Sequence, residues 1–159
     1  MKIPMDKDDP FLGASAPDFS LNDHEGRFRS LTDYSGKKLV LYFYPRDDTP
    51  GCTKEACGFR DSHDTIRKAG AEVVGVSRDG LSSHQRFRTK YSLTFPLLSD
   101  PEGEISKRYQ VYKMKNLYGR KSMGIERSTF IIDEKGIIIR VFRKVRVDGH
   151  LEEILDSLK

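Results

Sequence analysis

The sequence predicts one α/β domain, built on a mixed central sheet with helices on both faces. Strand-like runs alternate with helical patterns through most of the 159 residues, which is typical of parallel strands joined by helices. The last two strand-like runs are joined by the short Gly-containing link at residues 134–136, which favours an antiparallel hairpin. The chain has the length of one ordinary domain and contains no internal repeat or linker. We therefore expect a single domain over residues 1–159, with residues 1–10 as a loose lead-in.

The composition is that of a globular chain with many charges. Hydrophobic residues make up 36% and charged residues 33%, and 28 basic against 24 acidic side chains give a net charge of +4. This balance argues against a disordered chain. No run approaches the ~20 apolar residues that span a bilayer, and the first residues lack the shape of a signal peptide. We expect a cytoplasmic protein with no membrane partner.

The first half of the chain predicts a hairpin, a buried strand and a helix. Short runs at residues 18–21 and 27–31 flank a polar, Gly-containing turn and predict the hairpin. Residues 39–44, LVLYFY, predict a central strand buried on both faces, which ends at Pro45. Thr49 suits the N-cap, and Pro50 the first position, of one helix that ends near Gly70. One face of this helix carries a stripe of residues at helical spacing: Cys52, Ala56, Phe59, His63 and Ile66.

The second half of the chain continues the alternation. Residues 71–77 and 95–100 predict strands, and residues 82–92 and 102–109 predict helices. Two further strands at residues 129–133 and 137–145 precede an amphipathic helix at residues 151–159. Between these parts lies an irregular stretch, which we interpret as a solvated loop rather than a polyanion site, so that no nucleic-acid partner is expected. Its basic cluster comprises Lys113, Lys115, Arg120 and Lys121.

The position of Cys52 favours a reactive thiol. It lies one turn inside a helix that leaves the carboxyl end of a buried strand, where open α/β sheets place ligand sites. Free N–H groups and the positive end of the helix dipole stabilise a thiolate there. The nearby carboxylates of Asp47, Asp48 and Glu55 act against it, so a cation from elsewhere in the chain is required. From the helix position alone, a small buried core residue is an equal alternative.

The second cysteine, Cys57, follows five residues later on the same predicted helix. On an unbroken helix the two Cα atoms are about 8.6 Å apart, whereas a disulfide needs roughly 4.4–6.8 Å. A bond between the two sulfurs therefore requires the first turns to unwind, and an inert thiol is the alternative. The spacing is not that of a C-x-x-C exchange motif. The histidines at positions 24, 63, 84 and 150 are scattered and suit caps, packing or the surface, which argues against a metal site and against a Cys–His hydrolase.

The segment from Pro45 to Cys52 resembles the peroxiredoxin motif P-x-x-x-[TS]-x-x-C. Its extension TPGCTKEACGFRD is similar to the branch called bacterioferritin comigratory protein, or PrxQ. The later segments KYSLTFPLLSD, GIERSTFIIDEKG and RKVRVDGHLEEIL are similar to the same branch, in the same order. The resemblance covers about residues 11–158. It implies a thioredoxin-like fold with an N-terminal β-hairpin and a thiol-dependent peroxidase that reduces hydrogen peroxide and organic hydroperoxides.

The resemblance also implies roles for individual residues. Cys52 matches the peroxidatic cysteine that attacks the hydroperoxide, and Cys57 matches the resolving cysteine. Thr49 matches the hydroxyl that hydrogen-bonds the thiolate and the peroxide, and Pro45 matches the proline that shields the pocket from water. Arg127 matches the arginine that pairs with the thiolate, which is the cation that the local sequence lacks.

The implied cycle is self-contained. Arg127, Thr49 and the backbone N–H groups of Gly51 and Cys52 stabilise the charge that moves along the O–O bond. The Cys52 sulfenic acid then condenses with Cys57 to a disulfide, which a thioredoxin-like dithiol reduces. The cycle needs no cofactor and no metal. A monomer fits this branch, with a weak dimer as the alternative, and the chain has no third cysteine near its C-terminus.

Two other functions are compatible with parts of the sequence. One is a thioredoxin-fold oxidoreductase that acts on protein disulfides, which the absence of C-x-x-C opposes. The other is a basic binding or redox-sensor module without turnover, which only the basic cluster supports. Oxidation of the chain by peroxide alone, without a protein disulfide, separates the peroxidase from both.

Overall fold

A computed structural model describes residues 7–159, so the first six residues of the expected lead-in lie outside it. The strands are β1 (Ser20–Asp23), β2 (Phe28–Ser30), β3 (Lys38–Phe43), β4 (Ala71–Ser77), β5 (Leu97–Ser99), β6 (Tyr112–Leu117), β7 (Arg120–Ile125), β8 (Ser128–Ile132) and β9 (Ile138–Phe142). The helices are the 3-10 turn η1 (Leu31–Tyr34), α1 (Pro50–Asp61), α2 (His63–Lys68), α3 (Leu81–Tyr91), α4 (Glu104–Arg108) and α5 (His150–Ser157).

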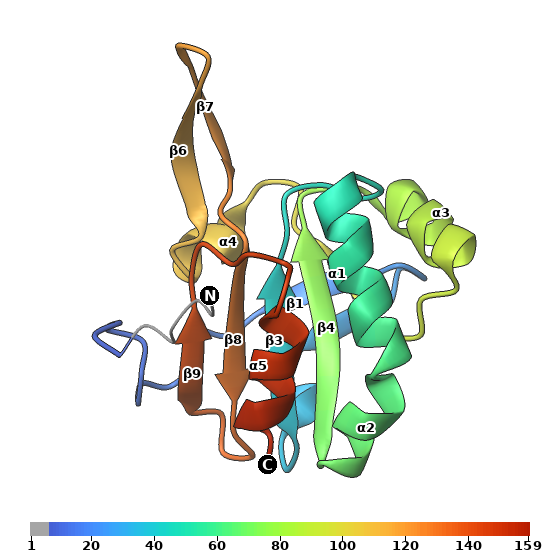
Figure 1. Cartoon of the computed structure of the whole chain (residues 1–159), viewed down its shortest axis with the longest axis vertical. Helices are drawn as coiled ribbons and strands as arrows, with labels where there is room; N and C mark the ends of the chain where they lie inside the picture. The colour runs from blue at the N-terminus through green and yellow to red at the C-terminus, as the bar shows by residue number, and fades with distance from the viewer. Residues whose placement is uncertain (1–6) are drawn as a thin grey trace.

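Seven of the nine described strands form a mixed sheet in the order β2-β1-β5-β4-β3-β8-β9, and β6 and β7 pair separately (Figure 1). Strand β4 runs parallel to β3 and β5, whereas β1 and β8 run antiparallel to the strands they adjoin. The β1–β2 hairpin and the β8–β9 hairpin are both antiparallel. These pairings confirm the predicted mixed sheet and its N-terminal hairpin. They also place β3, which contains residues 39–43 of the predicted 39–44 strand, in the interior of the sheet.

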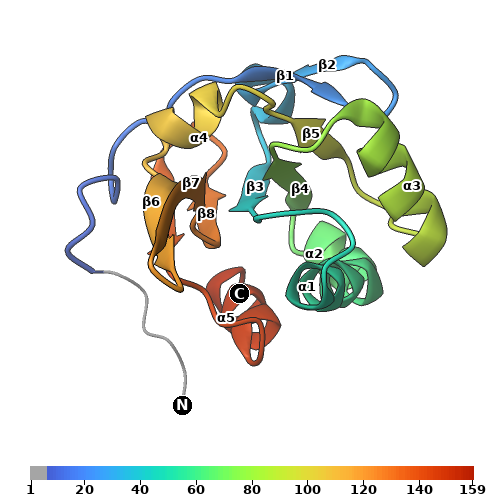
Figure 2. The same ribbon diagram turned by 90° about the horizontal axis from the view of Figure 1, so that it is seen from above.

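Alternate residues of β3 enter two separate parts of the core. Val40 and Tyr42 pack against α1, α2 and α5 on one face. Leu41 and Phe43 pack with α4, η1 and the base of β6–β7 on the other. Seen from above, the helices lie on either side of the strands, with α1, α2 and α5 together on one side and α4 on the other (Figure 2). Burial of both faces explains why this strand is a continuous apolar run.

The single helix expected between Pro50 and Gly70 is instead two helices that meet at Ser62. Ser62 has ψ of 9°, far from the helical value of about −42°. Hydrogen bonds nevertheless continue across it, from the Ser62 N–H to Gly58 O at 3.1 Å and from the Ile66 N–H to Ser62 O at 3.0 Å. The predicted stripe therefore stays on one face, and all of its residues are buried: Cys52, Ala56, Phe59, His63 and Ile66.

The basic stretch, predicted as a loop, forms the β6–β7 hairpin, which projects from the body of the fold (Figure 1). Its two-residue turn uses Tyr118 and Gly119, with φ of 53° and 78°. Positive φ at both positions is the conformation of a type I′ turn. Tyrosine seldom adopts this conformation, and the turn lacks the usual Asn-Gly sequence. The lysines of the stretch are also poor strand formers. The sequence therefore gives no local signal for this hairpin. No helix within residues 7–159 has the length and hydropathy needed to cross a bilayer.

Candidate active site

Cys52 lies in the first turn of α1, directly after the loop that leaves the carboxyl end of β3. The first helical hydrogen bond joins the Thr53 N–H to Thr49 O at 2.8 Å. The N–H groups of Gly51 and Cys52 therefore have no acceptor within the helix and are available to an anion. The side chain of Cys52 is a free thiol and only 2% exposed. The helix start at Thr49 and Pro50 is as the sequence predicts.

The cation that the sequence analysis requires is Arg127, which precedes β8. Its Nη2 donates a hydrogen bond to Cys52 Sγ at 3.3 Å. The antiparallel register of β3 and β8 pairs Phe43 with Ser128, and this pairing brings Arg127 to the end of β3. Gly51 leaves room for the guanidinium, since a Cβ on this residue would lie 3.2 Å from Arg127 Nη2. The structure thus brings together the two residues that the resemblance pairs.

Glu55 completes a three-residue arrangement in which Arg127 bridges the thiol and a carboxylate. Arg127 Nη1 donates to Glu55 Oε1 at 2.7 Å. The Glu55 side chain is 3% exposed, and its second oxygen, Oε2, has no partner within the described residues. Burial raises the pKa of Glu55 to about 7, although the neighbouring Arg127 cation opposes this rise. From the sequence alone, Glu55 is only a carboxylate that disfavours a thiolate. Its spacing of three from Cys52 is the signal that places both on one helix face.

Arg127 remains a cation in this setting. Burial disfavours its charge, but the interactions with Glu55 and Cys52 outweigh burial and raise the pKa of Arg127. Its carbonyl accepts a hydrogen bond from the Val145 N–H at 3.0 Å, which fixes the backbone beside the site. A partly buried, tethered guanidinium of this kind is a preorganised donor for negative charge that develops at the sulfur or on a bound peroxide.

The resemblance also names Thr49 and Pro45, which lie in the segment that joins β3 to α1. Thr49 occupies the N-cap position but makes no side-chain capping bond; its Oγ1 donates instead to Arg46 O at 2.9 Å. A hydroxyl has one proton and two lone pairs, so Thr49 can still accept a hydrogen bond. Pro45 follows the carboxyl end of β3 and is exposed. It lines the wall of a neighbouring groove.

Two of the carboxylates expected to disfavour the thiolate are engaged elsewhere. Asp47 is buried and accepts hydrogen bonds from the hydroxyl of Tyr44 at 2.5 Å and from Ser83 at 2.8 Å. Its Oδ2 also lies 2.7 Å from Nδ1 of the fully buried His84, which corrects the expected cap or surface role of that histidine. Asp48 binds Lys90 at 2.8 Å. These contacts tie the loop before Cys52 to α3.

Cys57 is a free, partly buried thiol on the same continuous helix as Cys52. It lines a pocket of about 450 Å³ between α1 and the start of α5. An ion pair between Lys54 and Asp148 spans this pocket. Because α1 is unbroken from Pro50 to Asp61, the two Cα atoms are too far apart for a disulfide in the folded protein. The two sulfurs therefore cannot bond without local unwinding.

His150 lies close to the arginine but does not contact the thiol. Its Nε2 shares a hydrogen bond of 2.8 Å with Oγ1 of Thr129, two residues after Arg127. Burial, with a smaller contribution from the Arg127 charge, lowers the pKa of His150 to about 4. A neutral imidazole at this place supports β8 and α5 without adding a second cation beside Cys52.

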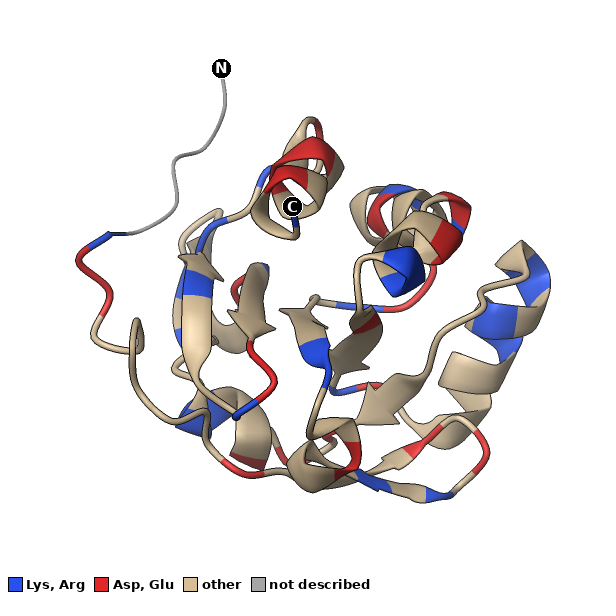
Figure 3. Ribbon diagram, turned by 90° about the horizontal axis from the view of Figure 1, so that it is seen from below, with Lys and Arg blue, Asp and Glu red and all other residues tan. Residues whose placement is uncertain are grey.

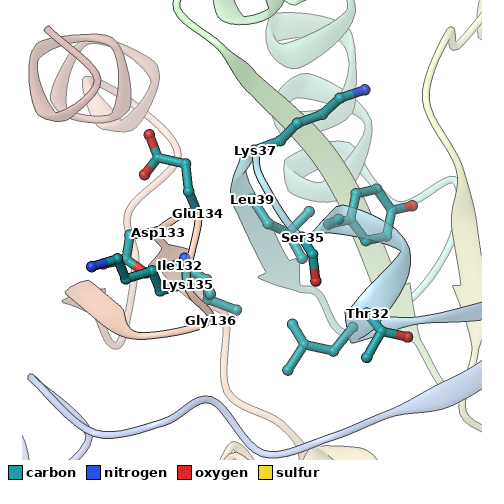
Figure 4. A pocket seen from close by; sticks show the side chains of 11 residues that line it. Thr32, Ser35, Lys37, Leu39, Ile132, Asp133, Glu134, Lys135 and Gly136 are labelled. Atoms are coloured by element: carbon teal, nitrogen blue, oxygen red, sulfur yellow. Dashed lines mark hydrogen bonds between the residues drawn. The ribbon is translucent and has the colours of Figure 1, made fainter.

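Another pocket lies at the opposite, amino end of β3, between η1 and the β8–β9 turn (Figure 4). Its volume is about 190 Å³. Lys37 and Glu134 stand at its rim, and the lining includes neither cysteine nor histidine. It therefore offers no thiol for redox chemistry, unlike the site at Cys52.

Comparisons with known proteins match this arrangement. The AhpC/TSA family model matches residues 12–141. A putative peroxiredoxin bcp of Coxiella burnetii is 52% identical over 92% of this chain and 97% of its own length. Peroxiredoxin Bcp of Bacillus subtilis is 47% identical over 93% and 94%. A solved structure of Xanthomonas campestris bacterioferritin comigratory protein, described with insights into its alkyl peroxide reduction activity, superposes with a TM-score of 0.84. It is 41% identical and covers 88% of this chain and 89% of its own.

Proposed function

The chain belongs to the AhpC/TSA family of peroxiredoxins, in its Bcp/PrxQ branch, and from this premise we propose a complete cycle at Cys52 and Cys57. Peroxiredoxins are thiol peroxidases, so the activity class follows from the family. The contact of 3.3 Å between Arg127 Nη2 and Cys52 Sγ carries the assignment of Cys52 as the nucleophile, because it gives a buried thiol the cation that a thiolate needs.

The first step is attack of the Cys52 thiolate on one oxygen of a hydroperoxide. An S–O bond forms as the O–O bond breaks, and the sulfur gives two electrons to the peroxide. The peroxide proton passes to the departing oxygen, which leaves as water or an alcohol, and the sulfenate on Cys52 takes up a proton from solvent to become the sulfenic acid. Thr49 accepts a hydrogen bond from the peroxide O–H, since its own proton is held by Arg46 O. Arg127 and the free N–H groups of Gly51 and Cys52 stabilise the charge that moves along the O–O bond.

The second step is condensation of the two cysteines. The Cys57 thiol attacks the Cys52 sulfenic acid, a disulfide forms and water leaves. The first turns of α1 must unwind to bring the sulfurs together, which breaks the contacts of Arg127 with Cys52 and Glu55 and the ion pair of Lys54 with Asp148. Gly58 follows Cys57 and lowers the cost of unwinding, since glycine is about 1 kcal/mol less favourable than alanine in a helix.

The third step is reduction by an external dithiol of the thioredoxin type. Its thiolate attacks the Cys52–Cys57 disulfide, and a second thiol of the reductant resolves the mixed disulfide. Both cysteines of the enzyme return to thiols and the reductant becomes a disulfide. The family resemblance and the alkyl peroxide reduction reported for the Xanthomonas relative support organic hydroperoxides as substrates beside hydrogen peroxide.

Peroxide consumption by two cysteine variants tests this assignment of roles. Cys52→Ser abolishes consumption, with or without thioredoxin. Cys57→Ser consumes one equivalent and then stops, because the sulfenic acid on Cys52 has no partner. If Cys57→Ser cycles normally with thioredoxin, the resolving role of Cys57 is wrong.

A further inference from the structure

The β6–β7 hairpin leaves a basic groove beside the active-site loop. The groove has a volume of about 520 Å³ and lies at the carboxyl ends of β3 and β4, where the hairpin projects in Figure 1. Open α/β sheets place ligands at this edge. Its lining comprises Pro45, Arg46, Arg78, Asp79, Lys115, Met123, Gly124 and Ile125.

The charge of this groove is positive, with three cations against one carboxylate. That carboxylate, Asp79, already accepts hydrogen bonds from the Asp47 N–H and the Ser77 hydroxyl, each at 2.8 Å. Arg78 donates to Pro101 O and stacks over the Tyr112 ring at 4.8 Å. Outside the groove, α1 and α2 carry both acidic and basic positions, whereas α3 carries basic positions only (Figure 3).

Lys115 is the cation that the β6–β7 hairpin contributes to the groove, beside Arg46 and Arg78 from the body of the fold. Within residues 7–159 it has no ion-pair partner, whereas its neighbour Lys113 pairs with Glu126 at 3.3 Å. Its exposed side chain lies against Gly124: a Cβ on Gly124 would lie 3.2 Å from Lys115 Cδ and 3.3 Å from its Cε. The absence of a side chain at Gly124 therefore allows Lys115 to lie across the hairpin.

Charges at the reactive centre affect the pKa of Lys115. Partial burial lowers the pKa of Lys115, and the Arg127 cation lowers it further, whereas Glu126 and Cys52 oppose these effects. The ammonium group is thus within electrostatic range of both Arg127 and Cys52. An anion bound at Lys115 would relieve the repulsion between Lys115 and Arg127.

We propose that this groove is a subsite for a carboxylate on the organic part of the hydroperoxide, and that Lys115 binds this carboxylate while the peroxide lies at Cys52. The inference rests on the proposed peroxidase function and names a substrate class within it: compact hydroperoxides that carry an anionic group a few bonds from the O–O bond. Hydrogen peroxide has no group that reaches the groove, and a neutral alkyl hydroperoxide has nothing for Lys115 to bind.

A matched pair of probes tests the subsite: 3-hydroperoxy-3-methylbutanoate, which is tert-butyl hydroperoxide with an added carboxylate, and its uncharged methyl ester. Rapid-quench mass spectrometry gives the second-order rate of Cys52 oxidation by each, with hydrogen peroxide as reference. We expect the carboxylate to react about tenfold faster than the ester, the effect of one charge-assisted contact. The preference declines at high salt.

Two lysine variants separate the subsite from the overall charge of the hairpin. Lys115→Met brings the carboxylate-to-ester ratio close to one. Lys121→Met removes the same charge from the same hairpin, but Lys121 pairs with Asn116 and lies on the opposite face from Lys115, so the ratio and the rate with hydrogen peroxide stay unchanged. The ratio cancels any general effect of a variant on the reactivity of Cys52.

Three results would overturn the subsite. A ratio near one in the unmodified protein, with normal oxidation by hydrogen peroxide, rejects the subsite and leaves the peroxidase intact. An equal fall in the ratio in both lysine variants assigns the effect to general charge. A ratio that stays tenfold in Lys115→Met, with slower reduction of the disulfide by thioredoxin, assigns the groove to the reductant. Failure of hydrogen peroxide itself to oxidise Cys52 rejects the proposed function as well.

Discussion

Replacement of Arg127 by glutamine is expected to damage both reactivity and stability, through different partners. The variant loses the donor at 3.3 Å from Cys52 Sγ and the donor at 2.7 Å from Glu55 Oε1. Loss of one preorganised donor costs about 10²–10³-fold in rate. Removal of one partner of a buried ion pair costs about 3–5 kcal/mol, because the other charge is left buried. Glu55, with 3% of its side chain exposed, is in that position.

The pH dependence of this stability loss has a definite sign. Loss of the Arg127 cation removes the interaction that lowers the pKa of Glu55, so that pKa rises above its value of about 7. The folded variant then binds a proton that the unfolded chain releases above its ordinary value of 4.5. Stability therefore falls as the pH rises from about 4.5, and it continues to fall until the pH has passed the raised pKa.

A second substitution, Glu55→Gln, separates the two effects. In Arg127→Gln/Glu55→Gln the carboxylate left without its partner is also removed. We therefore expect the free energy of unfolding at pH 8 to recover by about 2 kcal/mol, and to depend less on pH than in the single variant. The rate of peroxide reduction stays as low as in the single variant. Urea unfolding of the reduced proteins, followed by circular dichroism, gives the stability, and rapid-quench oxidation gives the rate. A double variant that regains the rate, or regains no stability, refutes this account of the Arg127 contacts.

Two further predictions concern the helix and the buried histidine. Gly58→Ala slows disulfide formation about fivefold, because it stabilises the helix by about 1 kcal/mol. It leaves sulfenic acid formation unchanged. The new Cβ fits without strain, since it lies at an ordinary 3.6 Å from Leu151 Cδ2. Equal rates of disulfide formation by stopped-flow mass analysis would argue against unwinding. Since the pKa of His150 is lowered to about 4, the folded protein loses up to about 3 kcal/mol as the pH falls from 6.5 to 4. His150→Gln removes this loss, and an unchanged acid limb in urea titrations would contradict it.

Much of the fold follows from local patterns in the sequence. Burial of both faces of β3 requires a continuous apolar run, and burial of one helix face requires the stripe that includes Cys52 and Phe59. Both patterns can be recognised in the sequence. The β6–β7 hairpin is different, because its turn depends on a tyrosine in a left-handed conformation at position 118. No local pattern signals that choice. Its pairing is set by backbone hydrogen bonds between two polar, exposed segments.

Some residues of the site follow from the local sequence, whereas others meet only in the folded chain. Cys52 and the N-cap position of Thr49 follow from the strand–turn–helix sequence around them. Arg127 lies 75 residues from Cys52 and meets it only through the β3–β8 register, so no local argument finds it, and only the family resemblance named it. Glu55 was visible on the correct helix face, but its partner was not. The contact between Lys115 and Gly124 depends on a hairpin that the sequence did not predict.

Intact mass after one equivalent of hydrogen peroxide tests the central claim most directly. The account predicts that the reduced protein rapidly loses about 2 Da as the Cys52–Cys57 disulfide forms, and that Cys57→Ser instead gains about 16 Da as a sulfenic acid. Cys52→Ser keeps its mass. No change in the unmodified protein, or oxidation only at large excess of peroxide, would show that Arg127 and the helix N-terminus do not activate Cys52.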